Sequence, residues 1–461
     1  MPVWRSRSVK WKFLIPTGLV VVAVLGVNSM AYAQLVRSCG TPSPLGPEGV
    51  ALSPGLGAAT PSGAGRGVVA PTTPASAASF DVLPSICVSE RYDSNVFFAP
   101  KTPGLTRNDF VTNVNPNLRI KHSGDYLTGV LDAGGFNETY VNNPDLNFFG
   151  STGNLSLNLD KSIKRLLPNA SLRIDDYVRY TPLPAGLASS APGTSPGAPV
   201  NQNTAFAQGL LAQRTNNVIN GGTAVMGYDT TASTSVNASY SYALLRYGSS
   251  PVTSQVTLFD TTTQTGAVQG IAKLSGLDTV NVKYSHTQSQ FSSNATSSLF
   301  KADTATLGWS RTIAQGLTAE VGGGGIIISP GFATYAANAA LILRSQSNSV
   351  TLSYARTAFP SFTGVGAMIV GDMFTFSAVQ NLGLQWQLVE AGGYAHSSGG
   401  GGNTAITYDT YSASVDLYYW ISRNWSTALS YDYLNYYANT AGTTIAFPRS
   451  VVALAIKAVW G

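Results

Sequence analysis

Two residues near the end of the chain, His396 and Ser398, have the types and the spacing that hydrolytic chemistry requires. Because they are two positions apart, both side chains point to the same face of an extended strand. A histidine beside a serine can accept the hydroxyl proton and make the serine a nucleophile. The pair also needs a third group to orient the histidine, and the sequence indicates none. The segment 397–403 is rich in glycine, which favours a loop, so we expect no enzyme and keep a hydrolase as a remote alternative.

Metal and cofactor chemistry has little support in the sequence. The two cysteines, Cys39 and Cys87, match no metal-binding spacing. In an oxidising compartment they could form a disulfide, and two unpaired cysteines are the equal alternative. The run Gly322–Gly325 has neither the lysine nor the following helix of a phosphate-binding loop. Glycines inside a strand often mark a bend, so we predict a bend there, no metal and no cofactor.

Charged residues recur in segments where apolar and polar residues alternate. The first clear segment runs from Phe110 to Lys121, and similar ones cover 170–180 and 235–245. A period of two predicts strands with one apolar face. A soluble sandwich alternates as well, but here the second face carries large polar and charged side chains in strand after strand. That pattern favours a closed barrel with water inside and lipid outside, which also satisfies every backbone group in a bilayer.

The connections between these segments alternate in length, long then short. This indicates an up-and-down antiparallel meander with short turns on the periplasmic side and longer loops outside. We predict an all-β transmembrane barrel of about 18 strands, with 16–18 plausible, in a Gram-negative outer membrane. The first strand is expected at about 84–98 and the last at 447–460, and the even number places both chain ends in the periplasm. One connection, at 329–331, is short where a long one is expected.

The start of the chain has the pattern of an export signal. Four basic residues precede an apolar stretch at 13–27, and Ala31-Tyr32-Ala33 then resembles a cleavage site. We predict a signal peptide at 1–33, with a membrane anchor or a lipoprotein as the alternatives. Residues 34–82 are rich in Pro, Gly, Ala and Ser and predict a disordered periplasmic linker. Removal of the signal reduces 27 basic residues to 23 against 22 acidic ones, so we expect no nucleic-acid partner.

The inner face of a barrel from 83 to 461 is the candidate functional surface. A barrel of this size is too wide for its own side chains to fill, so we expect water in the lumen unless a loop plugs it. The loop 182–212 has an apolar end and is predicted to fold partly inward. A basic excess favours anions, and ordinary charge without selectivity is the alternative. The candidate pore-lining residues are Arg119, Lys121, Arg173, Asp175, Arg179, Lys283 and Asp416, with Lys457 beside them.

Three short motifs resemble known families. The stretch Ser89–Phe98, with Tyr-Asp-Ser-Asn-Val-Phe at its centre, resembles the β-barrel porin-2 family and the related outer-membrane barrels of exopolysaccharide systems. The alternation that ends at Trp460 resembles the C-terminal assembly signal of bacterial outer-membrane barrels, although Gly461 follows the aromatic residue. The His396-x-Ser398 spacing is similar to that of outer-membrane phospholipases.

These resemblances imply a porin-like channel for passive passage of small polar solutes. An accessory or structural barrel of an exopolysaccharide export system is the alternative, and a phospholipase-like hydrolase is the remote one. The implied partners are outer-membrane lipid and the barrel-assembly machinery, with polysaccharide or export proteins as further candidates. Asp93 and Asn95 share one face of the motif and could bind a cation, but hydrogen bonding at the end of the first strand is the expected role.

Overall fold

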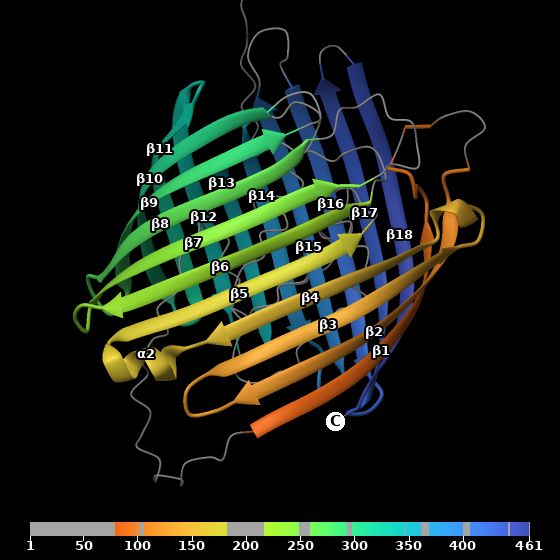
Figure 1. Cartoon of the computed structure of the whole chain (residues 1–461), viewed down its shortest axis with the longest axis horizontal. Helices are drawn as coiled ribbons and strands as arrows, with labels where there is room; N and C mark the ends of the chain where they lie inside the picture. Colours follow the sequence, from red (N-terminus) through yellow and green to blue (C-terminus); the bar gives the residue numbers. More distant parts are fainter. Residues whose placement is uncertain are drawn as a thin grey trace, which may run out of the picture.

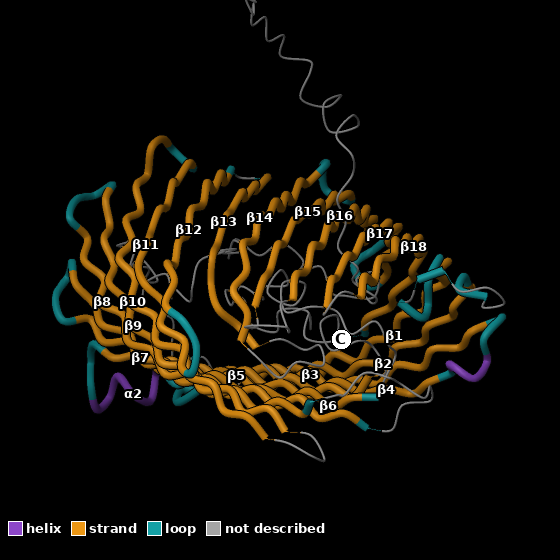
Figure 2. Tube along the Cα trace, turned by 90° about the horizontal axis from the view of Figure 1, so that it is seen from above, coloured by secondary structure: helices purple, strands orange, loops and turns teal. Residues whose placement is uncertain are grey.

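The chain forms a closed antiparallel barrel of 18 strands in the computed structural model (Figures 1 and 2). The structure describes residues 79–98, 100–101, 106–181, 216–248, 259–292, 297–345, 347–360, 368–399, 406–440 and 443–460. Several predicted segments lie outside the described residues: the signal peptide at 1–33, Cys39 and the loop 182–212. Of the linker expected at 34–82, only residues 79–82 are described.

Each strand pairs with its neighbours in sequence, and β1 also pairs with β18, which closes the sheet. The strands are β1 (Ser79–Asp93), β2 (Asp109–Ser123), β3 (Thr128–Tyr140), β4 (Phe148–Asn158), β5 (Ala170–Thr181), β6 (Asn217–Asp229), β7 (Thr234–Tyr247), β8 (Asp260–Lys273), β9 (Asp278–Ser292), β10 (Ser297–Ala314), β11 (Leu317–Ser329), β12 (Ala333–Arg344), β13 (Asn348–Pro360), β14 (Met368–Asn381), β15 (Trp386–Gly399), β16 (Ile406–Trp420), β17 (Trp425–Thr440) and β18 (Thr443–Val459).

Exposure alternates along the strands and separates an outer from an inner face. On β18, for example, Val452, Leu454 and Ile456 are exposed, whereas the residues between them are buried. Large apolar side chains on the exposed face of a closed barrel require an apolar solvent, because no monomeric soluble protein exposes an apolar surface of this extent. The barrel is therefore an outer-membrane protein, and its apolar outer band faces lipid.

Two elements differ from the sequence-based expectation. β1 begins at Ser79 rather than near 83, because Phe80 and Val82 continue the ladder opposite His122 and Ile120 of β2. The strand also ends at Asp93, so the expected strand 84–98 was set several residues too late. A short helix, α2 (Asp160–Leu166), stands at the turn between β4 and β5, where only a tight turn near 167–169 was predicted.

Most other connections follow the predicted alternation, with two corrections. The connection expected at 438–446 is short, because β17 ends at Thr440 and β18 begins at Thr443, and the one expected at 292–300 is short as well, because β10 begins at Ser297. At the end where β1 begins and β18 ends, the turns are short, and we call this the short-turn end. The opposite end, the long-loop end, carries a 3-10 helix, η2 (Pro144–Leu146), between β3 and β4. The connection between β11 and β12 is short, as expected. The described residues contain no helix that is long and apolar enough to cross a membrane.

The Ser89–Phe98 motif forms the seam between β1 and β18 at the long-loop end. The buried Arg449 of β18 binds Asp93 in a two-bond ion pair, with Nε 2.9 Å from Oδ1 and Nη2 2.5 Å from Oδ2. Asp93 also accepts a bond from the amide of Asn95 at 2.9 Å. The backbone of Phe98 has a positive φ of 53°. The centroid of the Phe98 ring lies 4.4 Å from the guanidinium carbon of Arg449. The motif thus has the hydrogen-bonding role expected of Asp93 and Asn95.

Candidate functional site: the lumen

The candidate pore-lining residues all fall on the inward-facing positions of their strands. Arg119 and Lys121 are on β2, Asp175 and Arg179 are on β5, and Asp416 is on β16. Arg173 and Lys283 occupy inward positions of β5 and β9 in the same way. Their role in transport stays a prediction, but the geometry brings two of the arginines next to carboxylates that sequence reasoning did not pair with them.

Ion pairs remove much of the expected basic excess. Arg119 Nε lies 2.6 Å from Oδ1 of Asp132, which stands directly opposite on β3. Arg173 Nε is 2.9 Å from Oδ2 of Asp175 on its own strand. Lys457 of β18 interacts electrostatically with both Arg119 and Asp132. Because each arginine charge is compensated at close range, these residues exert only a weak net field on a passing anion.

A second polar network lies nearer the long-loop end. Arg91 of β1 donates to Glu138 of β3 at 3.0 Å and to Tyr140 at 3.3 Å, and Tyr140 donates to Glu138 at 2.7 Å. All three side chains are buried. Arg179 is buried too, and its guanidinium lies 5.8 Å from the Phe136 ring. The network ties β1 to β3 across β2, so it stiffens this part of the wall.

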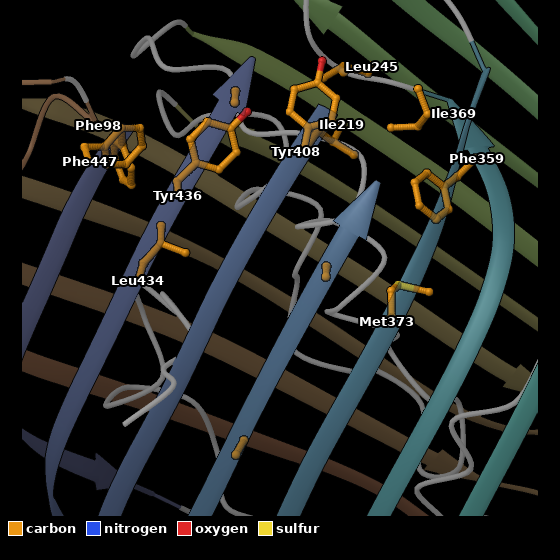
Figure 3. Close-up of a cluster of buried hydrophobic side chains, with 13 residues drawn as sticks. Phe98, Ile219, Leu245, Phe359, Ile369, Met373, Tyr408, Leu434, Tyr436 and Phe447 are labelled. Carbon is orange, nitrogen blue, oxygen red and sulfur yellow. The ribbon is translucent and has the colours of Figure 1, made fainter. Parts of the chain in front are cut away.

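An apolar cluster projects into the lumen at the long-loop end (Figure 3). We call it the apolar constriction. It joins side chains of β6 and β7 with side chains of β13–β18, strands that are not neighbours in the sheet. Its larger members are Phe98, Ile219, Leu245, Phe359, Ile369, Met373, Tyr408, Leu434, Tyr436 and Phe447. The inner wall is therefore apolar over part of this end.

Burial differs between the two sides of the lumen. Inward side chains of β16 and β17 are buried along the length of both strands: Ser412, Ser414 and Asp416 are 0–2% exposed, and Ser430 is 2% exposed. On β7, by contrast, Asn237, Ser239 and Ser241 face inward and are only half-buried. The inward side chains of β16 and β17 therefore have less access to solvent than those of β7.

The structure supplies the group that the hydrolase alternative lacked. Nδ1 of His396 lies 2.8 Å from Oδ1 of Asp409, which stands directly opposite on β16. These side chains are on the outer face of the barrel, however, and His396 also stands opposite Asp372 of β14. No hydrogen bond connects His396 with Ser398, although both are described residues.

Cys87 faces the lumen and is buried. It is disulfide-bonded, and no cysteine among the described residues is free. The candidate partner Cys39 lies outside the described residues. Within the same part of the chain, no group of three or more His, Cys, Asp or Glu is placed to hold a metal ion.

No family model matches the chain, and no curated protein matches its sequence. Among solved structures, the barrel is similar to the outer membrane protein OpdK of Pseudomonas aeruginosa, with a TM-score of 0.43, 8% identity, and coverage of 82% of this chain and 99% of that one. OccK3 (OpdO) of the same organism has a TM-score of 0.38, 12% identity and coverage of 82% and 96%. The siderophore receptor PirA of Acinetobacter baumannii has a TM-score of 0.40, 8% identity and coverage of 84% and 81%.

These neighbours are all outer-membrane barrels, but similarity at this level transfers no activity or solute to the present chain. The outer-membrane assignment rests on the closed barrel and its apolar outer face. The resemblance of the Ser89–Phe98 motif to the porin-2 family stays a resemblance.

Proposed function

We propose that the barrel is a channel for passive passage of small polar solutes, and that the path follows the inner faces of β7, β8 and β9. The observation that carries this proposal is the half-exposed polar wall formed by Asn237, Ser239, Ser241, Thr263 and Thr265. Hydroxyl and amide groups can replace the hydration of a neutral or weakly charged solute as it passes. The pairing of Arg119 and Arg173 with carboxylates supports weak ion selectivity.

Single-channel conductance of the refolded full chain in a planar bilayer tests the proposal. We expect stable open steps for the wild type. Ser241→Trp should lower the step size, because the new ring projects into the path. The neighbouring Tyr240→Trp is the matched control, since Tyr240 faces lipid, and it should leave the step unchanged. Equal effects of both variants would contradict the proposed path.

A structural or accessory barrel within an export assembly is the second candidate. The apolar constriction and the buried inner wall of β16 and β17 favour it, because both reduce the free cross-section. This candidate predicts a chain that folds, with heat-modifiable migration on gels, yet gives no open steps. Removal of constriction side chains, as in Leu434→Ala with Met373→Ala, should then be required before conductance appears.

A further inference from the structure

A row in which basic and acidic residue types alternate crosses the outer face of four neighbouring strands. Arg356 of β13, Asp372 of β14, His396 of β15 and Asp409 of β16 stand directly opposite one another in successive strand pairs. We call this row the polar ladder. Its side chains are partly exposed. Ion pairs join Arg356 to Asp372 and His396 to Asp409.

An aromatic row lies directly beneath the polar ladder, one outward position closer to the short-turn end. It consists of Tyr354, Phe374, Tyr394 and Tyr411, which are also successive cross-strand partners. Ring centroids of Tyr354 and Phe374 are 4.8 Å apart, and those of Tyr394 and Tyr411 are 4.8 Å apart. Two tyrosines donate upward into the ladder, Tyr354 to Asp372 at 2.7 Å and Tyr394 to Asp409 at 2.9 Å.

The same arrangement recurs on β9 and β10. His286 stands opposite Asp303, with Nδ1 2.8 Å from Oδ1. Tyr284, two residues before His286, donates to the same carboxylate oxygen at 2.6 Å. The β9–β10 site and the β15–β16 part of the polar ladder have the same design. In each, a tyrosine and a histidine lie two residues apart on one strand, and an aspartate stands opposite the histidine on the next strand. The two sites are separated by β11 and β12, so the arrangement occurs at two separate places on the outer wall.

The height of the polar ladder matches one surface of a membrane. A second outward aromatic pair, Trp386 and Tyr419, lies at the short-turn end with centroids 4.4 Å apart. From Tyr419 to Asp409 along β16 is ten residues, which at roughly 3.3 Å per residue and a tilt of about 40° spans about 25 Å. The apolar band of an outer-membrane barrel is about that tall. The polar ladder therefore lies where the hydrocarbon ends and the headgroups begin.

We propose that the polar ladder and the Tyr284–His286–Asp303 site bind phosphate groups of outer-leaflet lipid headgroups. The aspartates hold Arg356 and the two histidines in place beside the headgroup layer. His396 and His286 each use Nδ1 for the aspartate, which leaves Nε2 of each ring without a hydrogen-bond partner among the described residues. Arg356 is held between Asp372, which accepts from Nη1, and the Tyr335 ring, 4.4 Å from its guanidinium carbon. Its Nε is buried, so Nη2 is the nitrogen that can donate to a phosphate oxygen.

The arrangement favours lipid over a second copy of the chain as the occupant. A flat protein contact would cover one stretch of wall, whereas the two sites lie on β9–β10 and on β13–β16, with small residues such as Gly323, Gly325 and Ala337 on the outer face between them. Annular lipid contacts the whole circumference and reaches both. The aromatic row below the ladder then packs against the upper acyl segments, as tyrosines do at membrane interfaces.

The test is lipid binding by the full chain in neutral detergent, counted by native mass spectrometry. The probes are phosphatidic acid, phosphatidylcholine and diacylglycerol. We expect phosphatidic acid to bind about tenfold more tightly than diacylglycerol, the difference that one charge-assisted hydrogen bond can supply. Arg356→Gln with His396→Gln should remove most of this preference, and His286→Gln should remove a smaller part. Lys283→Gln, a lumen-facing cation that lipid cannot reach, is the matched control and should bind like the wild type.

Asp372→Asn with Asp409→Asn keeps Arg356 and His396 and removes two carboxylates, so it should retain or increase phosphatidic acid binding. This second variant tests the proposal if the first one fails to fold. Heat-modifiable migration checks folding in each case. Equal binding of diacylglycerol and phosphatidic acid would overturn the proposal. Competition by inorganic phosphate at the same concentration would identify a free anion instead of a lipid and would overturn it too. If the variants changed the oligomeric state without changing the number of bound lipids, the polar ladder would be a contact surface for a second copy of the chain, and the proposal would be overturned.

Discussion

The inner wall of the barrel has two different sides. Along β16, β17 and β18 the inward side chains are buried from one end to the other, including polar ones such as Ser414, Asp416 and Ser430. Along β7 the inward residues in the middle of the strand, such as Ser239, are half-buried. Lys283 of β9 is half-buried too, whereas Gln269 of β8 and Ser285 of β9 are buried. Both sides have the same alternation and a similarly polar inner face. The difference shows that a polar inward residue is not by itself a pore-lining residue.

The closing seam belongs to the buried side. β18 completes the barrel by pairing with β1, and the Asp93–Arg449 pair lies inside that junction. Cys87 and Ala455, from β1 and β18, are buried in one cluster with Tyr418 of β16 and Ala428 of β17. The buried side is thus also the side that holds the ends of the sheet together, so changes there should affect stability more than transport.

The largest expected effect is on this seam. Arg449→Ala leaves the buried Asp93 carboxylate without its partner and should destabilise the barrel by about 3–5 kcal/mol. The matched control is Arg246→Ala on β7, whose pair with Asp260 is 3.0 Å long but half-exposed, and this variant should lose less than about 1 kcal/mol. Urea unfolding followed by heat-modifiable migration measures both. Similar losses would remove the distinction between the two sides.

Thiol labelling gives the next largest contrast. Ser239→Cys on β7 should react readily with a hydrophilic maleimide, because its side chain meets lumen water. Ser414→Cys on β16, which is 1% exposed, should react at least about a hundredfold more slowly, since labelling there needs a local opening. Mass spectrometry of the folded chain over time gives both rates. Comparable rates would show that the buried wall is wet in solution.

The smallest effect concerns charge. Lys283→Gln on the half-exposed side should shift the reversal potential in a salt gradient toward cations, with a change in permeability ratio of about twofold, because the remaining charges are screened. Lys457→Gln on the buried side should leave the ratio unchanged, since Lys457 is only 8% exposed and lies beside Arg119 and Asp132. A larger shift of the reversal potential for Lys457→Gln than for Lys283→Gln would indicate that the solute path follows the wall formed by β16, β17 and β18.

The period-two pattern was sufficient to predict the 18 strands and the face on which each candidate residue lies. Counting along a strand decides which side chains face inward, so Arg119, Arg179 and Asp416 could be placed without knowing their neighbours. The same counting assigns Tyr240, Tyr431 and Trp460 to the lipid face, where they are exposed. The limit was the start of β1, because residues 79–83 follow a composition typical of linkers.

Cross-strand partners could not be predicted, because they depend on register. The Arg119–Asp132 pair and the His396–Asp409 pair each join two strands, and a shift of two residues would separate them. The apolar constriction was missed for a related reason. Phe359, Leu434 and Phe447 are ordinary apolar residues of alternating strands, and only the closed geometry brings strands from both sides of the lumen into one cluster. Burial of one inner wall likewise depends on what fills the lumen.

The early start of β1 limits how deep the barrel can lie in the bilayer. β18 begins to pair with β1 only at Ser85, opposite Val459, while Trp460 donates to the Pro84 carbonyl at 2.9 Å. From Ser79 to Val82 the ladder therefore continues on the β2 side alone among the described residues. Peptide groups on the other side need water, because hydrocarbon cannot satisfy them. Lipid tails therefore cannot extend to residues 79–82, and this part of β1 sets a lower limit for the hydrocarbon layer.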